Sequence, residues 1–210
     1  MIPPYNPKSS LTNYRGLIPS PIGGANIGEN VVFRGKNLHV DFKNSSWMNL
    51  YLYGITAKEI NPSQERILEK IFIYTSYPDV RIWNNRIAAL AGSFRSSIYL
   101  GVAASLATSD AKIYGGGINA RAAVFIKKVS ELLSNKQDIS TLILEELKEH
   151  RAIAGFGRPV SSRDERIEPL MSTLKEEGLE SGACINAVYA VQKWLDEHRY
   201  RLKANYAAFA

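Results

Sequence analysis

The chain has 210 residues, of which 45% are hydrophobic and 22% are charged, which is typical of one folded domain, with or without a small subdomain. Its 26 Lys and Arg residues exceed its 20 Asp and Glu residues, so the formal net charge is +6. Because acids are mixed among the bases and no nucleic-acid motif accompanies them, this charge indicates a surface that favours phosphates or carboxylates in general.

Cysteine and histidine are too scarce to support a disulfide or a zinc site. Cys184 is the single cysteine, and the three histidines do not cluster with acids at ligand spacing. The first 21 residues lack the charged region and apolar run of a secretory signal. The most apolar stretch, residues 87–111, is interrupted by Arg95 and several serines. We therefore expect a cytoplasmic protein that does not associate with membranes and holds no metal.

The amino-terminal part of the chain predicts an arm followed by strands. Residues 1–30 contain most of the prolines and several glycines, which predicts an extended arm with turns. Residues 31–42 alternate apolar and polar side chains, which predicts a short strand or hairpin with Arg34–Lys36 at its bend. We expect one larger helical domain over residues 31–210.

Three helices are predicted next. Residues 45–54 begin with candidate serine caps and end at Gly54. The helix over 61–77 has Asn61 as its cap and Pro62 at its first position. The helix over 81–109 is the longest and rich in small side chains, which predicts either a dimer interface or a central helix within one subunit.

The carboxyl-terminal half predicts four more helices. A glycine turn precedes a helix over 118–133, whose apolar stripe includes Ala122 and Phe125. Helices are also predicted over 138–151 and 164–177, and Pro169 could delay the start of the second. The last helix, from residue 183, meets no glycine or proline before residue 210. We expect that this end docks on a partner or that the chain is shorter there than its relatives.

Three glycine-containing or apolar motifs follow the small-residue helix in a set order. They are "IYGGGINARAA", "GFGRPVSSRDER" and "ACINAVYAV", and the earlier "VVFRGKNLHVDF" and "NLYLYGIT" add to the pattern. In this order the sequence resembles the citrate synthase superfamily, which includes citryl-CoA lyases and the lyase module of ATP-citrate lyase. The similarity extends from about residue 31 to residue 206.

The resemblance implies a mainly α-helical fold in which central helices pair two subunits into a homodimer. It also implies carbon–carbon bond formation or cleavage on a CoA thioester and a di- or tricarboxylic acid, by an acyltransferase or a lyase. In such enzymes an aspartate is the base, two histidines polarise carbonyls, and arginines hold carboxylates. The resemblance implies no permanently bound cofactor, with a coenzyme A thioester as a substrate.

The three catalytic positions that the resemblance assigns are all changed. Tyr114 stands for the histidine of "HGG", Arg158 for the histidine of "GxGH", and Asn186 for the aspartate of "NVD". Asn186 has no carboxylate to accept a proton, and loss of a positioned base costs about 10² to 10⁴ in rate. Tyr114 can still donate a hydrogen bond, and Arg158 can grip a carboxylate or phosphate with two bonds.

The remaining candidate site residues are arginines and glycines. Arg166 stands for the arginine of the family's "DPR" and is the best candidate for carboxylate binding, with Arg163 adding positive charge nearby. Asp164 and Glu165 weaken this case by offering internal partners, and the alternative is a helix N-terminus that bears acids and a solvated basic face. Gly155 and Gly157 would let the backbone approach a ligand. An anion-binding nest is a candidate at Gly115, Gly116 and Gly117, and a tight turn explains that glycine run equally well.

Three functions remain open on the sequence alone. The first is an enzyme of the citrate synthase or citryl-CoA lyase type with non-standard chemistry, in which another residue or the substrate itself acts as base. The second is a non-catalytic ligand-binding protein, or a partner subunit of a longer homologue. Nucleic-acid binding driven by the basic charge is the third, and the lack of a motif disfavours it.

Overall fold

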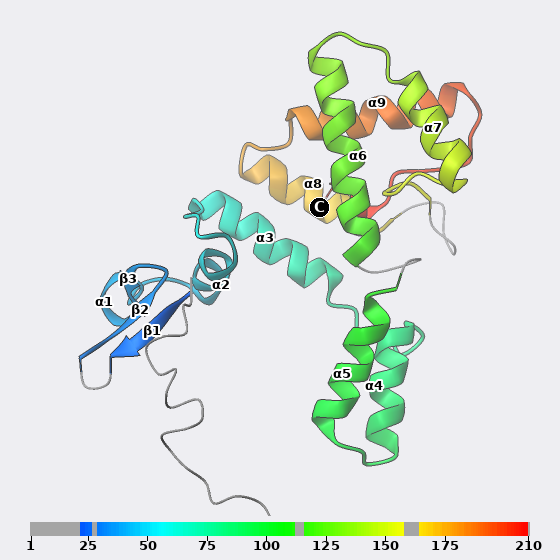
Figure 1. The fold of residues 1–210 in the computed structure, drawn as a ribbon. Helices are drawn as coiled ribbons and strands as arrows, with labels where there is room; N and C mark the ends of the chain where they lie inside the picture. The colour runs from blue at the N-terminus through cyan, green and yellow to red at the C-terminus, as the bar shows by residue number, and fades with distance from the viewer. Residues whose placement is uncertain (1–21, 27–28, 112–115, 158–163, 210) are drawn as a thin grey trace, which may run out of the picture. The chain divides into compact units, whose positions relative to one another are not determined.

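The computed structural model describes residues 22–26, 29–111, 116–157 and 164–209, and the chain divides into two compact units, residues 1–66 and 67–210. Over the described residues it has ten helices and one three-stranded sheet (Figure 1). The predicted mainly α-helical fold is therefore confirmed. No helix in the described ranges is both long enough and apolar enough to cross a membrane.

The first unit contains the sheet. Its strands are β1 (Gly23–Asn26), β2 (Asn30–Phe33) and β3 (Lys36–Asn37), antiparallel in that order. The predicted hairpin bend is confirmed, with Arg34 and Gly35 both at positive φ. The continuation as a strand was wrong, because residues 38–41 form the short helix α1 (Leu38–Asp41). The Asn37 side chain accepts hydrogen bonds from the N–H groups of His39 and Val40 and so caps this helix.

Helix α2 (Trp47–Thr56) follows the sheet and packs against it. Ser46 caps it by accepting a hydrogen bond from Asn49 N. The predicted end at Gly54 was wrong, because the helix continues to a left-handed Ala57. Gly54 serves close packing instead, since a Cβ there would lie 2.7 Å from the Phe33 ring. Arg34 reinforces the contact by donating a hydrogen bond to the Gly54 carbonyl.

Helix α3 (Pro62–Thr75) spans the boundary between the two units. The predicted start is confirmed, with Pro62 at the first helical position. Asn61 and Gln64 each bond the other's backbone N–H, which is a reciprocal cap. The cap satisfies two N–H groups that the first helical turn leaves without intrahelical partners.

The single long helix predicted over residues 81–109 is two helices, α4 (Trp83–Ser93) and α5 (Ile98–Ser109), which lie side by side in Figure 1. The chain turns at Arg95, which adopts a left-handed conformation. The Ser96 N–H bonds the Ala91 carbonyl and the Arg95 N–H bonds the Gly92 carbonyl, which is the Schellman pattern of a helix end. The stretch of small residues is therefore a helical hairpin.

The hydrophobic core of the second unit forms around α6 (Gly116–Ser134), α7 (Ser140–His150) and α9 (Ala183–Glu197). The predicted stripe of α6 is confirmed, because Ala122, Phe125, Ile126 and Val129 are buried. Figure 1 shows α9 crossing α6, and the two helices are in contact. Helix α8 (Ile167–Glu176) joins a second cluster of Leu170, Leu174 and Tyr206, against which α3 packs.

The last predicted helix ends far earlier than expected. Helix α9 stops at Glu197 because Arg199 is left-handed and the Tyr200 N–H bonds the Leu195 carbonyl, again a Schellman end. The chain then runs back across the unit and finishes in α10 (Tyr206–Phe209), which contacts α6 and α9. We call residues 202–209 the return segment. It contributes buried side chains to both core clusters, and it defines the surroundings of the candidate site.

Candidate functional site

The glycines of "GFGRPVSSRDER" lie against the return segment. Phe156 pairs with Ala204 as an isolated β-bridge. The Gly157 N–H donates to the Lys203 carbonyl at 2.6 Å, and the Asn205 N–H donates to the Gly155 carbonyl at 2.8 Å. The Asn205 side chain also donates to the Gly157 carbonyl at 2.7 Å. These bonds anchor the start of the motif to the carboxyl-terminal part of the chain.

Both glycines have a structural reason for lacking a side chain. Gly155 and Gly157 have φ values of +87° and +98°, which L residues rarely adopt. A Cβ at Gly155 would lie 3.0 Å from Ala208 and 3.2 Å from Ala122, and one at Gly157 would lie 3.1 Å from Leu202. The missing side chains at these two glycines therefore let other parts of the same chain pack closely against the backbone. Contact of a ligand with these glycines stays a prediction.

Arg166 is held by the carboxylate of Asp164. Arg166 donates from Nε to Oδ1 at 2.8 Å and from Nη2 to Oδ2 at 2.7 Å, a two-bond pairing that fixes the plane of the guanidinium. The Tyr206 N–H donates to the same Oδ2 at 2.9 Å. The Asp164 side chain is fully buried, and 24% of the Arg166 side chain is exposed. The sequence expectation that Asp164 offers Arg166 an internal partner is confirmed.

Burial and charge act in opposite directions on the pKa of the Asp164 carboxyl. Desolvation by burial raises the pKa, whereas the hydrogen bonds from Arg166 and from the Tyr206 N–H lower it. The net effect is a pKa below the usual value, so the carboxylate is ionised at neutral pH. The pair therefore consists of a carboxylate anion and a guanidinium cation.

Two tyrosine rings complete the surroundings of Arg166. Its guanidinium carbon lies 4.8 Å from the centre of the Tyr206 ring and 5.6 Å from that of Tyr77, distances at which cation–π attraction operates. Tyr77 donates a hydrogen bond to Glu165 at 2.7 Å. Tyr206 is buried among apolar side chains, and burial raises the pKa of its hydroxyl to about 12. The Tyr206 hydroxyl finds no hydrogen-bond partner within the described part of the chain.

The other candidates divide into those that the structure places and those outside the described residues. Asn186 is exposed in the first turn of α9, and its neighbour Ile185 packs on the cluster that contains Tyr206. Gly116 is the exposed first residue of α6, and none of the described residues crowds the position where its Cβ would stand. Four candidates lie outside the described residues: Tyr114, Gly115, Arg158 and Arg163.

The structure brings Gly155, Gly157 and Arg166 together through the return segment, with the start of α9 joined to the same cluster. Sequence reasoning missed Tyr77, Asn205 and Tyr206 as members of these surroundings. For Asn205 and Tyr206, the apolar periodicity of the last 28 residues carried no signal, because it suggested a continuous helix instead of a segment that turns back.

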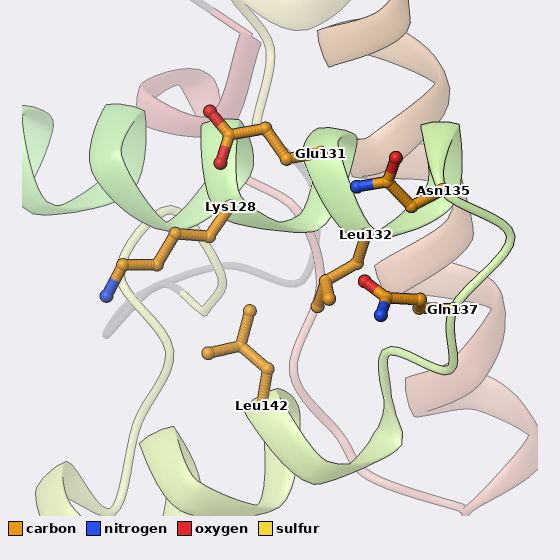
Figure 2. A pocket seen from close by; sticks show the side chains of 6 residues that line it. All are labelled: Lys128, Glu131, Leu132, Asn135, Gln137 and Leu142. Carbon is orange, nitrogen blue, oxygen red and sulfur yellow. The ribbon is translucent and has the colours of Figure 1, made fainter.

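A separate pocket of about 330 Å³ lies where α6 ends and α7 begins, lined by Lys128, Glu131, Leu132, Asn135, Gln137 and Leu142. Figure 2 shows the two leucine side chains pointing toward each other, with Lys128 and Glu131 directed away from them. None of the sequence candidates that the structure describes lines this pocket. Within the described ranges, no three His, Cys, Asp or Glu residues gather as a metal site would require.

Comparisons with solved structures show which fold this is. A citryl-CoA lyase from Hydrogenobacter thermophilus is 19% identical with a TM-score of 0.76, over 91% of this chain and 73% of that one. An ATP citrate lyase variant from Methanosaeta concilii, in complex with (3S)-citryl-CoA, is 18% identical with a TM-score of 0.73, over 99% of this chain and 34% of that one. Citrate synthase from Thermotoga maritima MSB8 is 14% identical with a TM-score of 0.57, over 77% and 43%.

The TM-scores show a shared fold. The chain spans about a third of the length of the ATP citrate lyase that it resembles. No curated protein matches the sequence significantly. A family model described as "Citrate synthase, C-terminal domain" matches residues 24–209. Because this match covers most of the chain, the protein belongs to the family of the citrate synthase C-terminal domain.

Proposed function

We propose that this protein binds a di- or tricarboxylic acid at Arg166 and acts on a CoA thioester of that acid, making or breaking a carbon–carbon bond with altered catalytic residues. The strongest support is the pairing of Arg166 with Asp164. Arg166 is partly exposed, and the buried carboxylate of Asp164 holds its guanidinium in one orientation. Such a preset guanidinium suits a planar, two-oxygen ligand such as a carboxylate. Family membership supports chemistry on CoA thioesters and carboxylic acids in general.

The acid to test first is citrate, with citryl-CoA as its thioester. Two of the similar structures are ATP citrate lyases, one in complex with (3S)-citryl-CoA and one with citrate and coenzyme A. In this chain, Tyr114 and Arg158 would donate to carbonyl or carboxylate oxygens by resemblance. Asn186 can hydrogen-bond a ligand and cannot accept a proton from carbon. Breaking the carbon–carbon bond of citryl-CoA needs a group that accepts the proton of the citryl hydroxyl and a group that donates a proton to the carbon of the departing acetyl-CoA enolate. Other residues or a substrate carboxylate would supply these groups.

A non-catalytic role is the second candidate, and the exposed Asn186 in place of an aspartate favours it. A protein that holds citrate or CoA without turning it over could act as a ligand sensor, or as a partner subunit of a longer homologue. Both candidates need the same anion site. They differ only in whether the bound thioester reacts.

The experiment combines binding with turnover. The wild-type chain is screened by thermal shift with citrate, oxaloacetate, CoA and acetyl-CoA, since a ligand that binds the native state raises the melting temperature. It is then incubated with citryl-CoA, and with acetyl-CoA plus oxaloacetate, while the CoA species are quantified. We expect a shift with citrate that disappears in Arg166→Gln, together with slow turnover. Binding without turnover selects the non-catalytic role, and no binding of any ligand contradicts both.

We propose further that the α4–α5 hairpin pairs two copies of this chain. Helix α5 carries no charged residue from Ile98 to Ser109, and Ile98, Tyr99 and Leu100 are 80%, 87% and 71% exposed. An apolar surface of this kind on a hairpin favours a protein–protein contact. The family resemblance, in which paired central helices make a homodimer, supports a second copy as the partner.

The dimer is tested by light scattering coupled to size-exclusion chromatography. The wild type is expected at about twice the mass of one chain, and Tyr99→Lys with Leu100→Lys at the mass of one chain, because two buried charges would cost several kcal/mol. The control is Leu144→Lys, which replaces an exposed leucine of α7, outside the hairpin, with lysine. A monomeric wild type, or a double variant that stays dimeric, would rule out this interface.

A further inference from the structure

We infer that Asp164 is a positioning residue, which orients the Arg166 guanidinium for a ligand carboxylate and ties that orientation to the return segment. The inference rests on the proposed function, because it concerns how the same arginine is presented. It adds Asp164 to the proposed site, and it makes the orientation of Arg166 depend on the return segment.

The hydrogen bonds of Asp164 suit such a role. One carboxylate oxygen accepts from Arg166 Nε and the other from Nη2, so the guanidinium cannot rotate without breaking a charge-assisted bond. The Arg166 N–H also donates to Oδ1 at 3.2 Å. Asp164 therefore contacts both the side chain and the backbone of the arginine that it orients.

The return segment contacts the Asp164–Arg166 pair through Tyr206. Its N–H donates to the Asp164 carboxylate at 2.9 Å, and its ring lies 4.8 Å from the guanidinium carbon. Asn205 fixes this position, since it bonds both Gly155 and Gly157 and caps α10 by accepting from the Ala207 N–H. A shift of the return segment would therefore change both the carboxylate and the ring that hold Arg166.

The sequence offers an internal comparison, because Asp79 and Arg81 repeat the same spacing and the same bonds. Arg81 donates from Nε and Nη2 to the Asp79 carboxylate, and its N–H donates to Asp79 Oδ1. In the first pair the arginine and aspartate side chains are 86% and 37% exposed. In the Asp164–Arg166 pair the arginine is 24% exposed and the aspartate is fully buried. The Asp-X-Arg pair alone is thus a local turn. Burial, the Tyr206 N–H and the two rings distinguish the Asp164–Arg166 pair.

Positioning and simple neutralisation predict opposite results. If Asp164 only cancels the charge of Arg166, its removal frees positive charge and strengthens the binding of an anion. If Asp164 positions the guanidinium, its removal lets the side chain rotate and weakens binding. The near-isosteric change Asp164→Asn removes the negative charge and keeps one oxygen that can accept from the Tyr206 N–H.

The test is a double-mutant cycle of Asp164→Asn and Arg166→Gln, with citrate and CoA titrated separately into the full chain by calorimetry. We expect Asp164→Asn to weaken citrate binding about 10-fold, and to have no further effect in the Arg166→Gln background, since residues that act as a unit are not additive. CoA affinity should stay within about twofold of the wild type. A general structural defect would lower the affinity for both ligands.

Each outcome of this test is informative. Unchanged or stronger citrate binding by Asp164→Asn overturns the inference and leaves the proposed function standing. A wild type that binds none of the carboxylic acids overturns both. If Asp164→Asn does not fold, Arg166→Lys takes its place, because lysine keeps the charge and lacks the planar guanidinium fork that a carboxylate holds in one orientation. Citrate binding by Arg166→Lys that equals the wild type would contradict the inference.

Discussion

Asp164→Ala is expected to lower the free energy of unfolding by about 3 kcal/mol, because removing one partner of a buried ion pair leaves the other uncompensated. The carboxylate is fully buried, and it accepts hydrogen bonds from the Arg166 side chain and from the Tyr206 N–H. We place the value at the lower end of the usual range because Arg166 is 24% exposed and keeps some hydration. Urea unfolding followed by circular dichroism measures it.

The matched control is Asp79→Ala, which removes the same bonds from an exposed pair and should leave the unfolding midpoint nearly unchanged. The pH dependence gives a second check. The pKa of Asp164 is lowered in the folded state, so its stabilisation is complete above the unfolded pKa of about 4 and is lost as pH falls through the folded pKa. The difference between wild type and Asp164→Ala should therefore stay constant from about pH 8 to 5 and shrink below about pH 4. A difference that grows in acid would contradict this account of the pair.

Gly155→Ala is expected to destabilise the chain by about 3 kcal/mol, from a left-handed backbone cost of about 1 to 2 kcal/mol and overpacking of about 1 to 3 kcal/mol. Its φ is +87°, and a methyl group there would lie 3.0 Å from the Ala208 Cβ and 3.2 Å from the Ala122 Cβ. The crowding falls where the return segment meets α6. Denaturant unfolding of the purified variant measures the loss.

Gly178→Ala separates the two contributions, because Gly178 also has a positive φ, of +67°, and apart from its chain neighbours none of the described residues lies within 4 Å of where its Cβ would stand. It should lose only the backbone cost, about 1 kcal/mol. If the two variants lose the same stability, packing of the return segment against Gly155 contributes nothing. If Gly155→Ala loses clearly more, the segment is part of the folded core.

Much of the fold was predictable because apolar periodicity and helix starts are local. The reciprocal cap at Asn61 and the apolar stripe of α6 are written in short stretches, and both were confirmed. Helix ends were harder. The end of α8 has a glycine, Gly178, in the left-handed position, and the helix predicted over residues 164–177 ends directly before it. Arg95 and Arg199 occupy the corresponding position at the ends of α4 and α9. An arginine there gives no compositional signal, so two helix ends were missed.

The candidate site depends on contacts that are distant in the sequence. The pairing of Asp164 with Arg166 is local, and the sequence indicated it. The bonds from Asn205 and Tyr206 join residues more than 40 positions apart, and they exist only because α9 ends at Glu197 and the chain turns back. Once that end was missed, no local pattern could place the return segment beside Arg166.

A calorimetric titration of citrate into the wild-type chain and into Arg166→Gln, at one pH and ionic strength, tests the proposed carboxylate site most directly. We predict saturable binding by the wild type and a loss of about 100-fold or more in the variant, whose melting temperature should be compared to confirm that it folds. Equal binding by the two proteins, or no binding by the wild type, would contradict the assignment of Arg166 as the carboxylate-binding residue.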